Sequence, residues 1–370
     1  MAQTRERRRM PDHPPEFSGD GFGRSWHRPW KEEFTEVATV SILGADRHPA
    51  PRTRDRVPLL MEIIEGLIHR AGLWRLDAIL FPGGFFRIGQ ALGDQDPQGR
   101  ITGLLQTKAA KAARKASHRL DAIWPWVTIV LGIDSNPMTG WRGGDQLVTA
   151  WQAGKLVGLA RKAFPVWTET GGTYEPVVWI KPEDADDPLR LITLRNGNRA
   201  ILCACYDAFA LRAVADPRFA DLGSIRLMRE DQGAYRRPTM FERQDHLRRW
   251  TAFLKAHPPD LALVAIHHFA RPGRDCYWQR HGIACASAGL SGAPILGAAH
   301  FREWLPTTVQ DCPLASQAVP PEHLVQGHHR KAHRLLPDDG FHLVDADGVP
   351  IALIRRFTLD HRLTQERNIP

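Results

Sequence analysis

The sequence predicts a mixed α/β fold built in layers, and three observations support this prediction. Short apolar runs alternate along most of the 370 residues with segments of helical periodicity. Many of these runs are apolar at almost every position, which is typical of strands buried on both faces. The chain shows no internal repeat, no Walker loop and no GxGxxG fingerprint, so nothing in it indicates a nucleotide-binding fold.

The first half of the chain provides strands and helices in alternation. Residues 1–35 are rich in Pro, Gly, Arg and Glu and are expected to form a flexible arm. The apolar run 37–45 predicts a first strand, and 54–72 predicts a helix because its apolar residues fall on one side ahead of a glycine. The runs 76–84 and 126–134 predict the next two strands.

The second half continues the pattern. Residues 145–164 predict a hairpin whose two strands join at Ala153-Gly154. A strand is expected in NRAILCACYD (198–207), and the polar stretch 211–255, with one amphipathic piece near 241–255, is interpreted as a long insertion beside the site. The remaining predicted elements are a strand over 260–270, a helix over 278–290, a strand over 293–301, and two strands over 340–357 around the turn Asp345-Ala346-Asp347-Gly348.

Composition and charge limit the class of protein. The content is 43% hydrophobic with 12 tryptophans, no apolar run approaches the roughly 20 residues that span a bilayer, and the basic start lacks the apolar segment of a secretory signal. Five cysteines without paired spacing predict a reducing, cytoplasmic location. Part of the net charge of +8 lies in KAAKAARKASHR (108–119), where basic residues recur at helical spacing without interleaved aromatics. We interpret that segment as a solvated helix face, and we do not expect nucleic-acid or membrane binding.

Cys205 lies where an apolar run meets the polar turn Tyr206-Asp207. A cysteine is often only a small packed hydrophobe, which is the interpretation of Cys203, but a strand end is also where side chains emerge into a site. A thiol becomes a good nucleophile beside a base or a positive charge, and amide chemistry also needs a group that stabilises negative charge. Lys162, in RKAFPVWTE, provides a cation at another strand end, whereas Lys181 is a weaker candidate.

Three segments together resemble the nitrilase, or carbon–nitrogen hydrolase, superfamily. They are CYD after an apolar strand, RK-x-F-P followed by a glutamate, and the apolar strand that ends in ILFP; the resemblance runs in order over roughly 37–357. It implies a four-layer α-β-β-α sandwich over 36–357, with a tail at 358–370, and a homo-oligomer that pairs across a helix face. It also implies a small-molecule amide or nitrile substrate, with no metal and no organic cofactor.

The family's catalytic set is Glu, Lys and Cys. Carried over by position, Cys205 matches the nucleophile that forms a thioester, Lys162 the lysine that stabilises the tetrahedral intermediate, and Glu169 the glutamate that supports the lysine. The backbone N–H of Tyr206 is expected to join Lys162 in the oxyanion site. Asp134, His267 and His268 are candidate substrate contacts at strand ends, and the alternative for the two histidines is an ordinary strand end.

The match fails at the family's general base, because Gly83 stands where a glutamate is expected after Phe81-Pro82. General base catalysis is typically worth roughly 10²–10⁴-fold, so this difference bears directly on activity. Three alternatives stay open. Another carboxylate takes the role, with Glu169 first and Glu175 and Asp207 behind it; or the protein binds a ligand, or serves as a scaffold, without hydrolysis; or the cysteine acts unaided on an activated substrate such as a thioester. A further hypothesis is that Gly83-Gly84 opens space for a larger substrate.

Overall fold

A computed structural model of the chain describes residues 34–43, 53–89, 92, 97–136, 144–165, 181–215, 228–229, 235–236, 238–269, 272–301, 308–311, 313–318 and 332–361. Most of its strands belong to one 14-stranded sheet, and β9 (Met228–Arg229) and β10 (Tyr235–Arg236) form a separate pair. The main path runs β6 (Lys155–Arg161), β5 (Gln146–Gln152), β4 (Thr128–Ser135), β2 (Ala78–Leu80), β1 (Phe34–Ile42), β12 (Ile295–Phe301), β11 (Leu261–Phe269), β8 (Arg199–Ala204) and β7 (Leu191–Thr193). Off this path lie β3 (Phe86–Ile88), β13 (Ala315–Ala318), β14 (Ala332–Arg334), β15 (Asp339–Val344) and β16 (Pro350–Asp360).

The sheet consists of two halves. β1 and β12 share one register pair, Ile42 with His300, whereas β1 pairs with β16 along its whole length. One half therefore runs from β6 to β1 and on to β16 and β15, and the other from β7 through β8, β11 and β12 to β13 and β14. The halves face each other, because a Cβ at Gly158 of β6 would lie 2.4 Å from the Ile192 side chain of β7.

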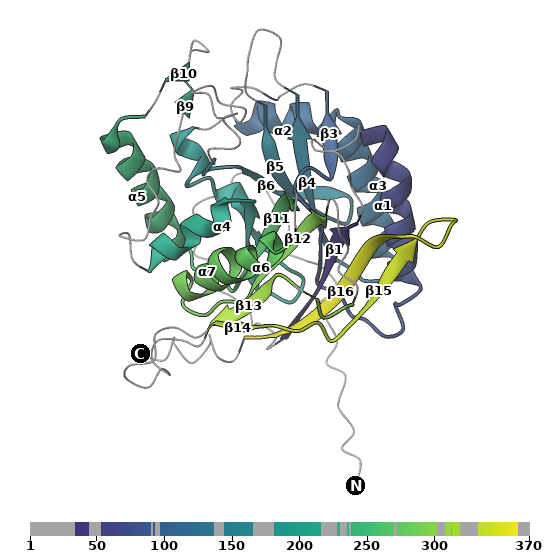
Figure 1. Cartoon of the computed structure of the whole chain (residues 1–370). Helices are drawn as coiled ribbons and strands as arrows, with labels where there is room; N and C mark the ends of the chain where they lie inside the picture. Colours follow the sequence, from purple (N-terminus) through teal and green to yellow (C-terminus); the bar gives the residue numbers. More distant parts are fainter. Residues whose placement is uncertain are drawn as a thin grey trace.

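Alternation along the strands produces three apolar cores. In β8, Leu202 faces the core between the two halves, and Cys203 faces the helices outside. The helices on one outer side are α1 (Thr53–Ile68), α2 (Pro97–Leu105) and α3 (Lys108–Asp121), and those on the other are α4 (Asp207–Ala210), α5 (Met240–Ala256), α6 (Arg274–Tyr277) and α7 (Ala284–Gly289) (Figure 1). The order helix, sheet, sheet, helix confirms the predicted four-layer α-β-β-α sandwich.

Most predicted elements are confirmed. The hairpin turns at Ala153 (φ 45°) and Gly154 (φ 73°), the two positive φ values that a tight β-turn of this hand requires. The predicted amphipathic piece near 241–255 is α5, which begins with a capping box at Thr239 and buries Trp250 in the outer core, and the interpretation of the whole stretch 211–255 as an insertion stays a prediction. β1 begins at Phe34 and β16 ends at Asp360, slightly outside the predicted limits 36 and 357.

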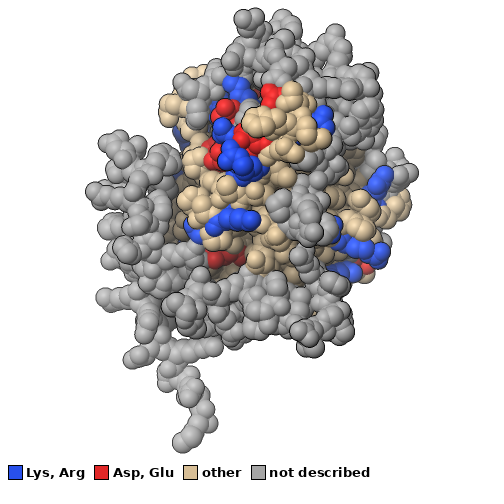
Figure 2. Space-filling view, turned by 90° about the vertical axis from the view of Figure 1, so that its left-hand side faces the viewer, with Lys and Arg blue, Asp and Glu red and all other residues tan. Residues whose placement is uncertain are grey.

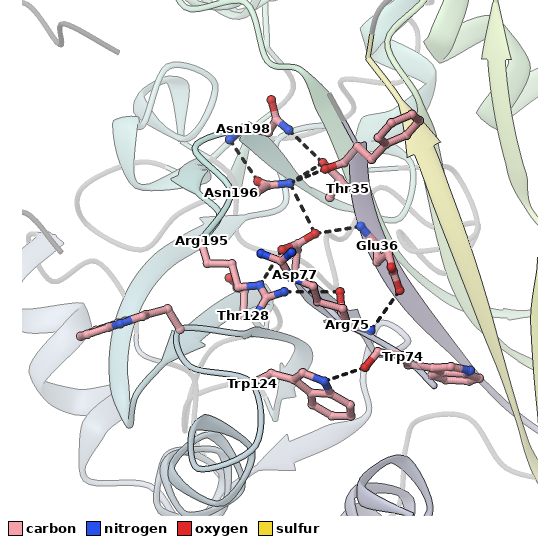
Figure 3. A network of polar contacts seen from close by, with 12 residues as sticks. Thr35, Glu36, Trp74, Arg75, Asp77, Trp124, Thr128, Arg195, Asn196 and Asn198 are labelled. Carbon is pink, nitrogen blue, oxygen red and sulfur yellow. Dashed lines mark hydrogen bonds and ion pairs between the residues drawn. The ribbon is translucent and has the colours of Figure 1, made fainter. Parts of the chain in front are cut away.

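A polar network ties the two halves together where the parallel strands begin (Figure 3). Asp77, just before β2, pairs with Arg195 in the β7–β8 turn at 2.6 Å and accepts the Glu36 N–H at 2.8 Å. In the same turn the Asn196 amide donates to Thr35 Oγ1 at 2.8 Å. Because these groups join the amino ends of the strands, the opposite, carboxyl edge is where the candidate site lies.

The described surface carries charges of both signs. On α3 the alanines are buried while Lys108, Lys111 and Lys115 are exposed, which confirms the predicted solvated helix face. On α5, Asp245 pairs with Arg248 and Arg249, and Figure 2 shows acidic and basic residues interleaved on one face of the molecule. Among the described residues, no helix is both long enough and apolar enough to cross a membrane.

Candidate functional site

The candidate site lies at the carboxyl edge of the parallel strands. β2, β4, β8 and β11 run in the same direction as β1 and β12, so their carboxyl ends meet at one edge. Gly83 follows β2, Asp134 ends β4, Cys205 follows β8 and His267 lies near the end of β11. The β4–β5–β6 hairpins return Lys162, directly after β6, to the same edge.

Cys205 occupies a strained turn between β8 and the short helix α4. Its φ is 49°, in the left-handed region that non-glycine residues rarely adopt, and its N–H donates to Ala265 O at 2.9 Å. Such strain costs of order 1–3 kcal/mol, and it is typical of nucleophiles presented at a strand-to-helix turn. Cys203, by contrast, is fully buried in the outer core, where burial strongly raises the pKa of its thiol. Cys203 is therefore packed, as predicted.

Asp207 holds the Cys205 turn against the segment that follows β6. Its carboxylate accepts the N–H groups of Ala163 and Phe164 at 3.0 and 2.9 Å and that of Ala204 at 3.2 Å. Arg190 lies 3.6 Å from the same carboxylate. Burial raises the pKa of Asp207, and the charges of Arg190 and Lys162 oppose that rise. These bonds give Asp207 a structural role and argue against it as the water-activating base.

Lys162 is fully buried, and its Nζ donates to Gln146 Oε1 at 2.9 Å. A buried ammonium needs an opposite charge or hydrogen-bond acceptors, and the Gln146 amide and the nearby Asp207 carboxylate provide them. Asp207 thus links Lys162 to the turn that carries Cys205. Lys181 lies in another segment, where its backbone N–H donates to Asp184.

The remaining predicted residues have mixed outcomes. The Tyr206 ring stacks on Phe209 with centroids 4.2 Å apart and meets the edge of Trp278, so its side chain belongs to an aromatic cluster. His268 is half-buried in β11. Glu169 and Glu175 lie outside the described residues, so their predicted roles stay predictions.

His267 and Asp134 form a buried pair that the sequence did not reveal. His267 Nε2 donates to Asp134 Oδ1 at 2.9 Å, and both side chains are more than nine-tenths buried. The Cys205 thiol lies close enough to the His267 ring to contribute to the pKa of that ring. Burial lowers the pKa of His267, but the charge and hydrogen bond of Asp134 outweigh it, together with Cys205, and raise that pKa to about 10.

A β-bulge in β11 places this histidine. The register against β12 shifts between Ala265 and His268, so that two residues of β11 oppose one of β12. The carbonyls of the bulge bind the rest of the site: Ala265 O accepts Cys205 N–H, and Ile266 O accepts Gly83 N–H at 2.9 Å. His300 Nδ1 donates to the His267 carbonyl at 2.7 Å. Bulges commonly re-aim side chains beside active sites.

Gly83 is tightly packed, so the hypothesis that it opens space for a substrate is wrong. A Cβ at this position would lie 2.8 Å from Ala265 O and 3.0 Å from His267 Nδ1. At Gly84, where φ is +63°, a Cβ would lie 2.6 Å from an oxygen of Asp134. The place where the resemblance puts a glutamate is therefore occupied by backbone and by the His267 ring.

Sequence reasoning assigned Asp134 and His267 to substrate contacts and overlooked their pairing. The residues lie 133 positions apart, and no local spacing connects them. The sequence contained one indication that His267 has a different role: a glycine replaces the expected base, and a histidine stands at the end of a strand on the same edge.

Comparisons with known proteins yield distant structural likenesses. An amidase from Nesterenkonia sp. is 12% identical, with 90% of this chain and 93% of that chain covered at a TM-score of 0.40. A CN-hydrolase superfamily protein from Xanthomonas campestris, with an arsenic adduct in its active site, is 12% identical over 91% of this chain and 94% of that chain, at a TM-score of 0.44. No protein-family model and no curated protein matches the chain. Identities and TM-scores this low say nothing about the site, so its function must be argued from its own residues.

Proposed function

We propose that the protein is a carbon–nitrogen hydrolase that cleaves small amides or nitriles through a covalent intermediate on Cys205. The observation that carries this proposal is the conformation of Cys205, held at a φ of 49° by a hydrogen bond to Ala265 O, on the same strand edge as a buried lysine. Strain of this kind persists only where the surroundings impose it, and it commonly serves function.

In the proposed reaction, the sulfur of Cys205 attacks the amide carbon, and the electron pair of the C=O bond moves to oxygen. Lys162 and the N–H of Tyr206 stabilise that negative oxygen. The C–N bond then breaks, the amine leaves with a proton, and a thioester remains on Cys205. Water adds to the thioester, and the acid is released as the thiol re-forms.

Amide turnover tests this proposal. Ammonia release from a panel of small primary amides should be measured for the wild type, Cys205→Ala and Lys162→Met. Activity should vanish in Cys205→Ala, because removing one member of a set that acts as a unit abolishes most of the catalysis. Lys162→Met should lose about 10²–10³-fold in kcat, the usual effect of removing one oxyanion donor.

Two matched controls separate chemistry from packing. Cys203→Ala removes a neighbouring buried thiol, and Lys155→Met removes an exposed lysine at the start of the same strand. Both should retain wild-type turnover per folded molecule. Equal activity in Cys205→Ala would contradict the proposal, and absence of turnover on every amide would favour a binding or scaffold protein. A cytoplasmic homo-oligomer, which the resemblance implies, is part of the same proposal, and sedimentation would test the assembly.

A further inference from the structure

We propose that His267 is the general acid and base of this site, in place of the glutamate that the resemblance predicts at position 83, with Asp134 as its positioning residue. This inference rests on the proposed function, because it assigns the proton transfers of the same cysteine. It differs from all three alternatives that the sequence left open, since the group is neither a carboxylate nor absent.

The geometry places the acid, the imidazole and the turn that carries the thiol at the same edge of the sheet. Asp134 Oδ1 lies 2.9 Å from His267 Nε2, and the N–H of Cys205 donates to Ala265 O, two residues before His267 in β11, at 2.9 Å. Because Asp134 occupies Nε2, we assign the proton exchange with the thiol to Nδ1. A base that a third group orients beside a nucleophile is the general arrangement that activates a nucleophile.

The backbone explains why a histidine can stand there. The bulge in β11 turns His267 toward the site, and Gly83 lies against the ring, so that a Cβ would be 3.0 Å from Nδ1 and 3.1 Å from Cε1. A glutamate at 83 and a histidine ring at 267 would compete for the same space. The glycine that breaks the family pattern is therefore the residue that admits the replacement base.

The charges around His267 favour a protonated ring. Asp134 faces it from β4 and Cys205 from the turn after β8, while His300 of β12 contacts its backbone carbonyl. Burial disfavours the imidazolium, but the Asp134 carboxylate prevails, so the pKa of His267 rises to about 10. In the pair that we propose, His267 holds the thiol proton and Cys205 attacks as a thiolate.

The proton transfers then balance across the reaction. The thiolate forms the C–S bond, and the imidazolium gives its proton to the departing amine as the C–N bond breaks. Neutral His267 next takes a proton from the attacking water, whose oxygen bonds to the thioester carbon. When the C–S bond breaks, its electron pair returns to sulfur, and the thiolate–imidazolium pair is restored. The net reaction is amide plus water to acid plus amine.

The test needs no substrate, so it stays separate from the proposed function. The rate at which iodoacetamide alkylates Cys205 should be followed from about pH 6 to pH 8 by peptide mass spectrometry, with the exposed Cys276 in the same digest for comparison. A thiolate paired with imidazolium should react at a rate that changes less than about 3-fold over this range. An ordinary thiol, which titrates near 8.5, should slow by about 100-fold between pH 8 and pH 6.

His267→Gln should convert the flat profile of Cys205 into the steep one, and Asp134→Asn should give a profile between the two. His257→Gln, at the exposed end of α5, is the matched control and should keep the wild-type profile. If His267→Gln does not fold, the isosteric Asp134→Asn carries the same comparison. A steep profile in the wild type, or a flat one in both site variants, would overturn the inference even if the enzyme hydrolyses amides. Absence of amide hydrolysis would contradict the proposed function, and it would leave the pH profile of Cys205 alkylation unaffected.

Discussion

Replacing Gly83 with Ala tests whether the packing around this position supports the site. The new Cβ would lie 2.8 Å from Ala265 O, whereas ordinary contacts begin at 3.4 Å, and the obstructing atom is backbone. The carbonyl would have to move by about half an ångström, and it accepts the N–H that fixes Cys205. Overpacking of this kind typically costs about 1–3 kcal/mol in the free energy of unfolding. We therefore expect lower stability and slower alkylation of Cys205.

Gly72→Ala is the matched control, because a Cβ there meets nothing within 4 Å. That change should be neutral or should stabilise the fold by about 0.4–1 kcal/mol through the unfolded chain. Urea unfolding and the alkylation rate of Cys205 should be measured for both variants. Adding His267→Ala to Gly83→Ala should not restore stability, since the nearest atom belongs to the Ala265 backbone. Equal urea unfolding midpoints and equal alkylation rates of Cys205 in Gly83→Ala and Gly72→Ala would contradict the expected effect of the Gly83 packing.

Three further changes follow from the buried charges. Asp134→Asn removes the charge that contributes most to raising the pKa of His267 to about 10, so that pKa should fall, and histidine-ring NMR should show the ring losing its proton at a lower pH than in the wild type. Asp207→Asn leaves the fully buried Arg190 without its carboxylate, and urea unfolding should show a loss of about 3–5 kcal/mol. Asp77→Asn, in the network at the opposite edge, should also destabilise the fold, yet turnover per folded molecule should match the wild type.

Much of the fold could be predicted because many of its strands are recognisable in the sequence as apolar runs. Runs such as 201–204 and 261–266 are apolar throughout, and such runs occur where both faces of a strand are covered. α5 could be predicted only as an amphipathic piece, because most of it is polar and its buried face depends on a few residues, Trp250 among them. Short strands such as β7 and β13 have too few residues to show an alternation of apolar and polar positions, so the sequence did not predict them.

The candidate site was predicted in part. Strand ends marked Cys205 and Lys162, and the structure brings their segments together through Asp207. The pairing of His267 with Asp134 could not be predicted, because it depends on a register shift within β11 and on two glycines that let backbone and ring approach. Neither feature has a signature in local sequence, since both are set by how distant strands align.

The central claim is that Cys205 is a working nucleophile, and trapping its acyl intermediate tests this most directly. The purified protein should be mixed with small amides, nitriles and an activated acyl ester and then quenched with acid. Its mass should be measured by intact-protein mass spectrometry, with Cys205→Ala in parallel. We expect an acyl adduct on the wild-type peptide that holds Cys205, no adduct on the variant, and slower decay of the adduct in His267→Gln. An unmodified wild-type protein with every compound, or an equal adduct on Cys205→Ala, would contradict the claim.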